Sequence, residues 1–206
     1  MSDKVEFAKI EKESLINGKE QRQLIEIPLL LIKNISQAKN KEKIKENVIK
    51  YYDQVKQWIM EFQKKVREIS IIYFASYTEK DDIDEFLDEN LDFHKEFKAF
   101  IKHLLKKVEL KVVEDYDLFL EFIGWLETIS MPGATEMDIK FFKDVSNERL
   151  EHISKHINES LKENQVGLLF INLNSGIIYP EELKVIHFKP PIVDEVKRLF
   201  ENIFED

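Results

Sequence analysis

Apolar residues recur every three or four positions along two long stretches of this chain. One stretch runs from Ile44 to Tyr73 and the other from Ile83 to Val108. This spacing places the apolar side chains on one face of an α-helix, so each stretch predicts a long amphipathic helix. The segment Asp115–Ser130 is apolar on nearly all sides, which predicts a helix buried within a bundle. That segment ends before the break at residues 131–133.

Three further segments follow the helical pattern over shorter distances. Val5–Asn17 is stopped by Gly18, Leu24–Ala38 has a proline near its first turn, and Leu150–Leu161 resumes the spacing of three and four. Together with the long segments, they predict an antiparallel helical bundle.

The pattern changes after residue 164. Val166–Leu173 is a compact apolar run and Leu183–Phe188 alternates, so both predict strands, with a turn signal at residues 174–176 between them. Pro190 and Pro191 stop the second strand, and Pro191 can begin a closing helix. The predicted fold class is mainly α: a helical bundle domain at residues 1–163, followed by a small C-terminal β-containing (α+β) module at residues 164–206. Deleting that module is expected to leave the bundle folded.

The composition is that of a folded chain with an excess of acidic residues. Charged residues make up 34% and hydrophobic ones 43% of the 206 residues. The net charge of −9 predicts weak or no direct binding to DNA. Cysteine is absent, which favours a cytoplasmic location. The N-terminus lacks the apolar core of a signal peptide and no apolar run is long enough to span a bilayer, so no membrane association is expected.

Few residues suggest catalysis. His152 and His156 stand four apart on a predicted helix, a spacing that lets two imidazoles share a metal ion, but the sequence supplies neither a third ligand nor the usual glutamate base. His187 has no nucleophile beside it, and the five glycines are isolated, so no phosphate-binding loop can form. We therefore expect a protein that is not an enzyme and uses no cofactor or metal. A metal-dependent hydrolase that uses His152 and His156 stays open as an alternative.

Charge is unevenly distributed along the chain. Nine basic and four acidic residues lie between Lys39 and Arg67, whereas nine acidic and two basic residues lie between Glu79 and Glu96. These segments are either solvated faces of neighbouring helices or docking surfaces for charged partners. If the basic segment is a docking surface, its candidate contacts include Lys56, Lys64 and Arg67.

The C-terminal region resembles the small β-domain of GINS subunits. The resemblance rests on the order and spacing of Gly176, Tyr179, Pro190 and Leu199. The first helix of that family is similar to "FAKIEKESLINGKEQRQLIEIP" in this chain, and its long helix is similar to "VKQWIMEFQKKVREISIIYFAS". Its acidic turn is similar to "SYTEKDDIDEFLDENLDF". The chain departs from the family at Leu183 and Lys184, where a Gly-Asp pair is common.

The resemblance implies an archaeal subunit of the α-then-β class with a role in DNA replication. Such a subunit is a non-enzymatic scaffold of the replisome that links and activates the MCM helicase. Its implied partners are a second GINS-type subunit in a heterotetramer, or a second copy of itself, together with MCM, a RecJ-like protein and primase. The implied partner contacts in the C-terminal module are Tyr179, His187, Phe188 and Pro190. An unrelated helical adaptor is the other interpretation.

Overall fold

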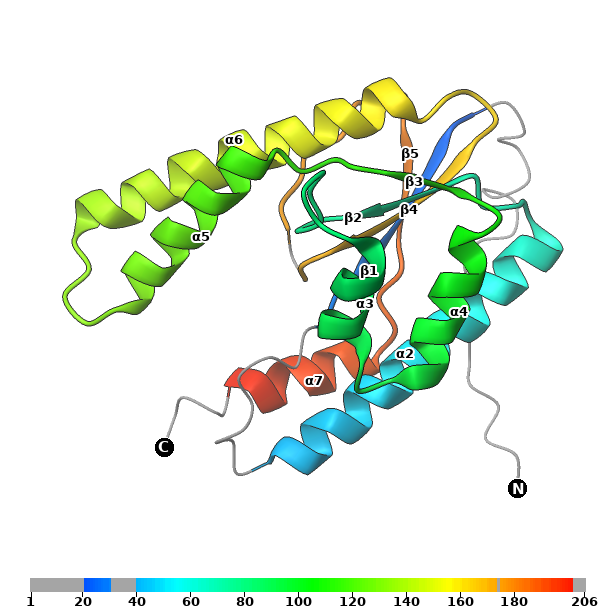
Figure 1. The fold of residues 1–206 in the computed structure, drawn as a ribbon, viewed down its shortest axis with the longest axis horizontal. Coiled ribbons are helices and arrows are strands. Elements are labelled where there is room, and N and C mark those ends of the chain that lie inside the picture. The colour runs from blue at the N-terminus through cyan, green and yellow to red at the C-terminus, as the bar shows by residue number, and fades with distance from the viewer. Residues whose placement is uncertain (1–20, 31–39, 174, 202–206) are drawn as a thin grey trace.

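A five-stranded sheet, in which every pairing is parallel, runs through the centre of the molecule. We describe it from a computed structural model that defines residues 21–30, 40–173 and 175–201. The strand order is β3-β2-β4-β1-β5 (Figure 1). The strands are β1 (Gln23–Pro28), β2 (Ile71–Phe74), β3 (Glu109–Lys111), β4 (Val166–Ile171) and β5 (Lys184–His187).

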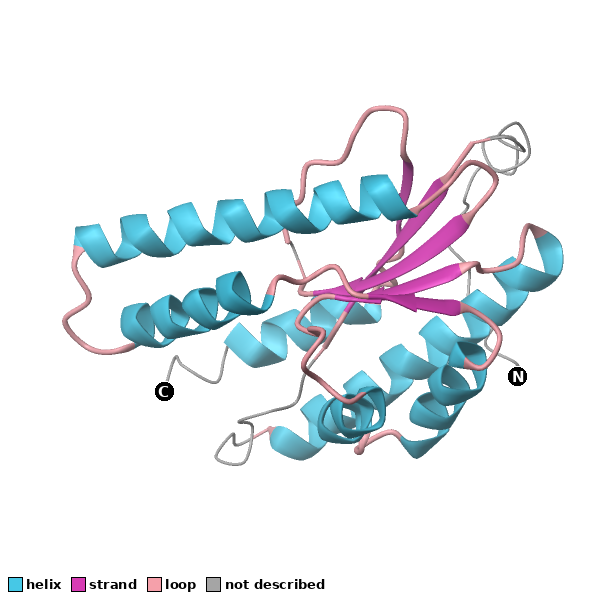
Figure 2. Cartoon of the chain, turned by 45° about the horizontal axis from the view of Figure 1, so that its top comes forward, coloured by secondary structure: helices cyan, strands magenta, loops and turns pink. Residues whose placement is uncertain are grey.

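Helices cover both faces of the sheet, giving three layers (Figure 2). The helices are α2 (Lys41–Lys65), α3 (Ile83–Leu91), α4 (Lys95–Leu105), α5 (Tyr116–Ser130), α6 (Glu136–Ser160) and α7 (Ile192–Glu201). On one face, α2, α3, α4 and α7 share an apolar core with side chains such as Ile25, Ile72 and Phe170. On the other face, the C-terminal half of α6 packs Ile153 and Ile157 into a second core.

Strand β4 holds the sheet together. All six of its residues are buried, and it pairs with β1 on one side and β2 on the other. A parallel strand covered by helices on both faces is apolar throughout, which is why this segment lacks alternation. The Tyr73 ring lies so close to the backbone of β4 that a Cβ at Gly167 would be 2.9 Å from it, which favours glycine at this position.

The predicted fold class is right in part. The protein is mixed α/β, and most of the predicted helices exist, but the sheet is not confined to a C-terminal module. Strands β4 and β5, from residues 164–206, pair with β1 and β2, from residues 1–163. The expected boundary at residue 163 therefore cuts through one sheet rather than separating a bundle from a module.

Two predicted helices contain strands. The described part of Leu24–Ala38 begins with β1, and the end of Ile44–Tyr73 is β2, because helix α2 stops at Lys65. Both strands are buried on both faces, so their continuous apolar runs extended the helical pattern instead of interrupting it. The predicted helix at Val5–Asn17 lies outside the described residues.

The helices predicted after Ile83 and the two predicted C-terminal strands are present in the structure. Ile83–Val108 is helical but divided into α3 and α4, with the His94 side chain capping α4 by accepting the backbone N–H of Phe97. The strands predicted at Val166–Leu173 and Leu183–Phe188 are confirmed as β4 and β5, and the closing helix as α7. These two strands are not neighbours, however, because β1 lies between them and all three run parallel. Across the described ranges, no helix is long and apolar enough to cross a membrane.

Candidate functional site

A crevice opens at the carboxyl ends of β1, β4 and β5. After β1 the chain turns toward the α2 side, where Leu29 and Leu30 are buried in the first core. After β4, Leu173 still packs against the first core, and the chain then reaches the α6 side, where Ile177 and Tyr179 pack against the second core. Adjacent parallel strands whose connections leave to opposite faces open a crevice between them, and ligands of α/β proteins commonly bind there.

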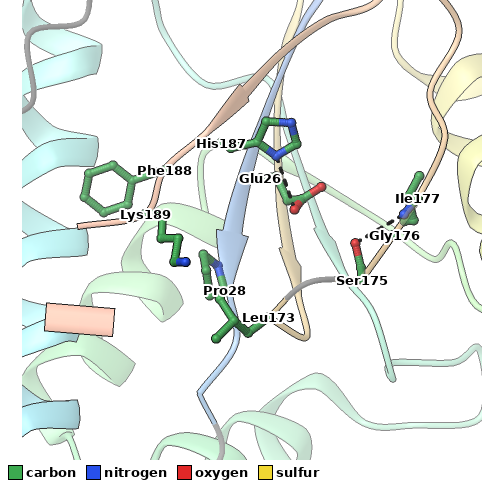
Figure 3. Close-up of a pocket in the computed structure, with 9 residues that line it drawn as sticks. All are labelled: Glu26, Pro28, Leu173, Ser175, Gly176, Ile177, His187, Phe188 and Lys189. Atoms are coloured by element: carbon green, nitrogen blue, oxygen red, sulfur yellow. Dashed lines mark hydrogen bonds and ion pairs between the residues drawn. The ribbon is translucent and has the colours of Figure 1, made fainter. Parts of the chain in front are cut away.

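Glu26 and His187 meet in this crevice (Figure 3), and Tyr179 contacts Glu26 from outside the residues that line it. Glu26 of β1 and His187 of β5 are register partners, and His187 Nδ1 lies 3.4 Å from Glu26 Oε1. The hydroxyl of Tyr179, from the β4–β5 connection, donates a hydrogen bond of 2.7 Å to Glu26 Oε2. The Glu26 side chain is only 15% exposed, whereas that of His187 is 64% exposed. Glu26 is thus an almost enclosed carboxylate with a neighbour on each oxygen.

The tyrosine is held in its protonated form. Burial raises the pKa of Tyr179 far above its ordinary value, and the nearby charge and hydrogen bond of Glu26 raise it further. Tyr179 therefore acts as a hydrogen-bond donor to the carboxylate over the whole physiological pH range.

The remaining walls of the crevice are mainly apolar. They enclose a cavity of about 310 Å³ whose lining also includes Pro28, Leu173, Ile177 and Phe188 (Figure 3). Lys189 lies at the same edge, where its Nζ is 2.9 Å from Asp194. The cavity volume is at the lower end of the range for small-ligand sites.

The structure brings two of the candidate contacts from the C-terminal region to the same carboxylate. Tyr179 and His187 both approach Glu26, and the ring of Phe188 lies 4.6 Å from that of Trp58 in α2, on the opposite face of the sheet. Pro190 is buried at the start of α7, where its carbonyl accepts a hydrogen bond from Val193. Pro190 thus has a packing role, and Phe188 both packs on Trp58 and lines the crevice. His187 lines the crevice, and Tyr179 holds Glu26.

The three basic candidates lie elsewhere, on or just after α2. Lys56 pairs with Glu96 of α4 at 3.5 Å, and Arg67 donates to the carbonyl of Gln21. Lys64 is exposed in the last turn of the helix. The structure does not place any of them in the crevice, and their role as partner contacts stays a prediction.

Glu26 is the residue that the sequence analysis missed. It lay inside a segment assigned to a helix, so its place in a strand and its pairing with His187 were not foreseen. One signal was available: an acidic residue within the apolar run "QLIEIPLLLI" needs a polar partner if the run is buried.

The histidine pair on α6 does not form a wider cluster. The rings of His152 and His156 stack with centroids 4.0 Å apart, and His156 Nδ1 approaches the carbonyl of His152. Within the described ranges, no group of three or more His, Cys, Asp or Glu side chains could hold a metal ion.

His152 should make stability depend on pH. Burial, followed by the charge of His156, lowers the pKa of His152 below its ordinary value, against smaller opposing effects of Asp115 and Glu114. The unfolded chain therefore takes up this proton more readily, so stability should fall as the pH drops through about 6.5. Replacing His152 by Gln should flatten the dependence of urea unfolding between about pH 7 and 5. His103→Gln, at an exposed position, serves as the control, and an equal change in both variants would contradict the prediction.

A second feature is the helical hairpin of α5 and α6. The turn between the helices uses Gly133 at a φ of +95°, and Thr135 begins α6 in a capping box with Asp138. Residues 116–145, which we call the arm, project beyond the edge of the sheet (Figure 1). At the base of the arm, buried Arg149 donates from Nε to Glu114 Oε2 at 2.8 Å.

The arm has many exposed apolar side chains, whereas most apolar side chains elsewhere in the described chain are buried. No residue of α5 is fully buried, contrary to the prediction for Asp115–Ser130. Aromatic pairs join the two helices: Phe122 with Phe142 and Trp125 with Phe141. Of the nine large apolar side chains that are exposed among the described residues, six lie here. They are Leu120, Leu126, Met131, Met137, Ile139 and Phe141.

No protein-family model matches the sequence, and no curated protein or solved structure is significantly similar to the chain. The residues and their geometry are therefore the basis for the functional argument below.

Proposed function

We propose that this protein is a non-enzymatic, cytoplasmic scaffold that associates through its arm. The observation that carries the proposal is the exposed apolar surface of α5 and the start of α6. A helix that is apolar on nearly all sides is normally buried, and two helices cannot bury one another completely. Contiguous exposed apolar surface on a folded protein marks an interaction site.

The partner that best fits the arm is a second copy of the chain. Each copy offers the same pair of antiparallel helices, so one two-fold contact covers the apolar surface of both arms and forms a four-helix bundle. Acidic Asp117, Glu121 and Glu127 interrupt the apolar face of α5 and would lie toward the rim of such a bundle, where charges remain solvated.

The resemblance to GINS subunits suggests a narrower function. In that version the partner is a second GINS-type subunit, and the complex links the MCM helicase with a RecJ-like protein and primase. This function stays a prediction from sequence motifs, because the parallel α/β sheet departs from the α-then-β order that the resemblance implied.

Charged substitutions on the arm should abolish self-association. We expect the full chain to be a dimer, and the double variant Leu126→Lys, Met137→Lys to be a monomer, because four lysines would be buried per interface. These side chains are 38% and 61% exposed, so the fold should lose little stability. Analytical ultracentrifugation, with helicity measured by circular dichroism, tests both points.

The control is Met60→Lys on α2, where the side chain is 52% exposed but lies away from the arm. It should remain dimeric. A wild-type chain that is monomeric at about 100 μM would contradict self-association. Capture of a different helical subunit that the double variant fails to bind would instead assign the arm to a hetero-oligomer.

A further inference from the structure

We propose that the crevice at the carboxyl ends of β1, β4 and β5 binds a small ligand through its hydroxyl groups, with Glu26 as the main acceptor. The ligand class is a pentose, either free or as the ribose of a nucleoside. This inference concerns a different surface from the arm and does not depend on self-association.

The position of the crevice is the first argument. It lies where the chain leaves β1 and β4 toward opposite faces of the sheet, which is the general position of ligand sites in open parallel sheets. Its lining comes from three strand ends that are far apart in the sequence. The cavity of about 310 Å³ has room for a ligand of this size.

The state of Glu26 is the second argument. A carboxylate enclosed in a central strand is costly, and the neighbouring residues of β1 are all buried. Tyr179 donates to one oxygen and His187 lies beside the other, so each oxygen has one polar neighbour. Each carboxylate oxygen has a further lone pair, which can accept a hydrogen bond from a hydroxyl group of a ligand.

The residues that line the cavity suit a sugar ring, which has both hydroxyl groups and apolar carbon faces. Leu173, Ile177 and Pro28 offer apolar surface for the carbon face of a sugar ring or for a base. Ser175 lines the same cavity and adds a hydroxyl that can donate or accept. Gly176, with a φ of +75°, also lines the cavity, and no heavy atom lies within 4 Å of where its Cβ would stand.

The simpler alternative is that Glu26 only tethers the β4–β5 connection through Tyr179. Calorimetric titration of the full chain with D-ribose and with adenosine separates the two interpretations. We expect saturable binding of at least one of them, and binding about tenfold weaker or worse for 2′,3′-dideoxyadenosine than for adenosine, since a hydrogen bond to a charged acceptor is lost. Ribose binding alone would identify a free pentose, and adenosine binding alone a nucleoside.

Variants locate the site. Glu26→Gln keeps the shape of the side chain and should weaken binding about tenfold. Glu121→Gln, on the arm, should leave binding unchanged. The proposal is overturned if neither probe binds at about 10 mM, if the dideoxy compound binds as well as adenosine, or if Glu26→Gln binds normally. Where adenosine binds, its comparison with the dideoxy compound uses the unmodified chain and decides the question even if Glu26→Gln fails to fold. Where only ribose binds, 2-deoxy-D-ribose takes the place of the dideoxy compound in that comparison.

Discussion

A chain truncated after Asn164 should fail to fold. The truncation removes β4, which lies between β1 and β2, and leaves the apolar faces of α2 and α6 without the centre of the sheet. Hydrogen-bond partners are lost along two strands at once, so the loss should reach about the 5–15 kcal/mol that stabilises an ordinary domain. Circular dichroism should show a large loss of helical signal, with rapid degradation in limited proteolysis.

This result would reverse the expectation that a helical bundle survives deletion of residues 164–206. A truncation after Glu201 is the matched control, because it retains every described helix and strand. If the shorter chain kept a cooperative unfolding transition with near-native helicity, the N-terminal elements would form a domain of their own.

Replacing Arg149 by Met should be strongly destabilising. The side chains of Arg149 and Glu114 are 5% and 0% exposed, and two guanidinium nitrogens donate to the two carboxylate oxygens. The guanidinium also lies 4.6 Å from the centre of the Phe122 ring. Removing it leaves a buried carboxylate without its counter-ion, at a cost of about 3–5 kcal/mol. Urea unfolding measures this loss as a shift of the midpoint.

Two further variants show whether the unpaired charge is the cause. Adding Glu114→Leu to Arg149→Met should restore much of the stability, because the buried charge disappears with its partner. Lys102→Met, which breaks surface contacts of a lysine with Asp84 and Asp88, should shift the urea midpoint much less than Arg149→Met does. A double variant no more stable than Arg149→Met alone would point to lost packing rather than to the carboxylate.

The positions of several elements follow from local spacing. Helix α2 was predicted from apolar residues three and four apart, and that face is buried against the sheet. Strands β4 and β5 were predicted from β-branched content and alternation, and Pro190 and Pro191 correctly separated β5 from α7. In each case the signal lies within one segment, where the side chains themselves set the backbone conformation.

The sequence identified only some residues of the candidate site. Tyr179 and His187 were named from the sequence, but for partner binding, and Glu26 was assigned to a helix. Their proximity depends on the register of β1 with β5 and on the path of the β4–β5 connection. Neither can be deduced from a pattern within one segment.

The amino-acid order alone was therefore enough to place α2, α5, the C-terminal half of α6, β4, β5 and α7. The parallel sheet, the exposure of α5 and the meeting of Glu26 with His187 arose from the tertiary structure. Strand β2 is apolar on both faces, and β1 is apolar except at Gln23 and Glu26, because helices cover both sides of the sheet. A short run of this kind has no period that separates strand from helix. Likewise, the apolar surface of α5 predicts burial, but only the arrangement of the elements leaves it exposed on the arm.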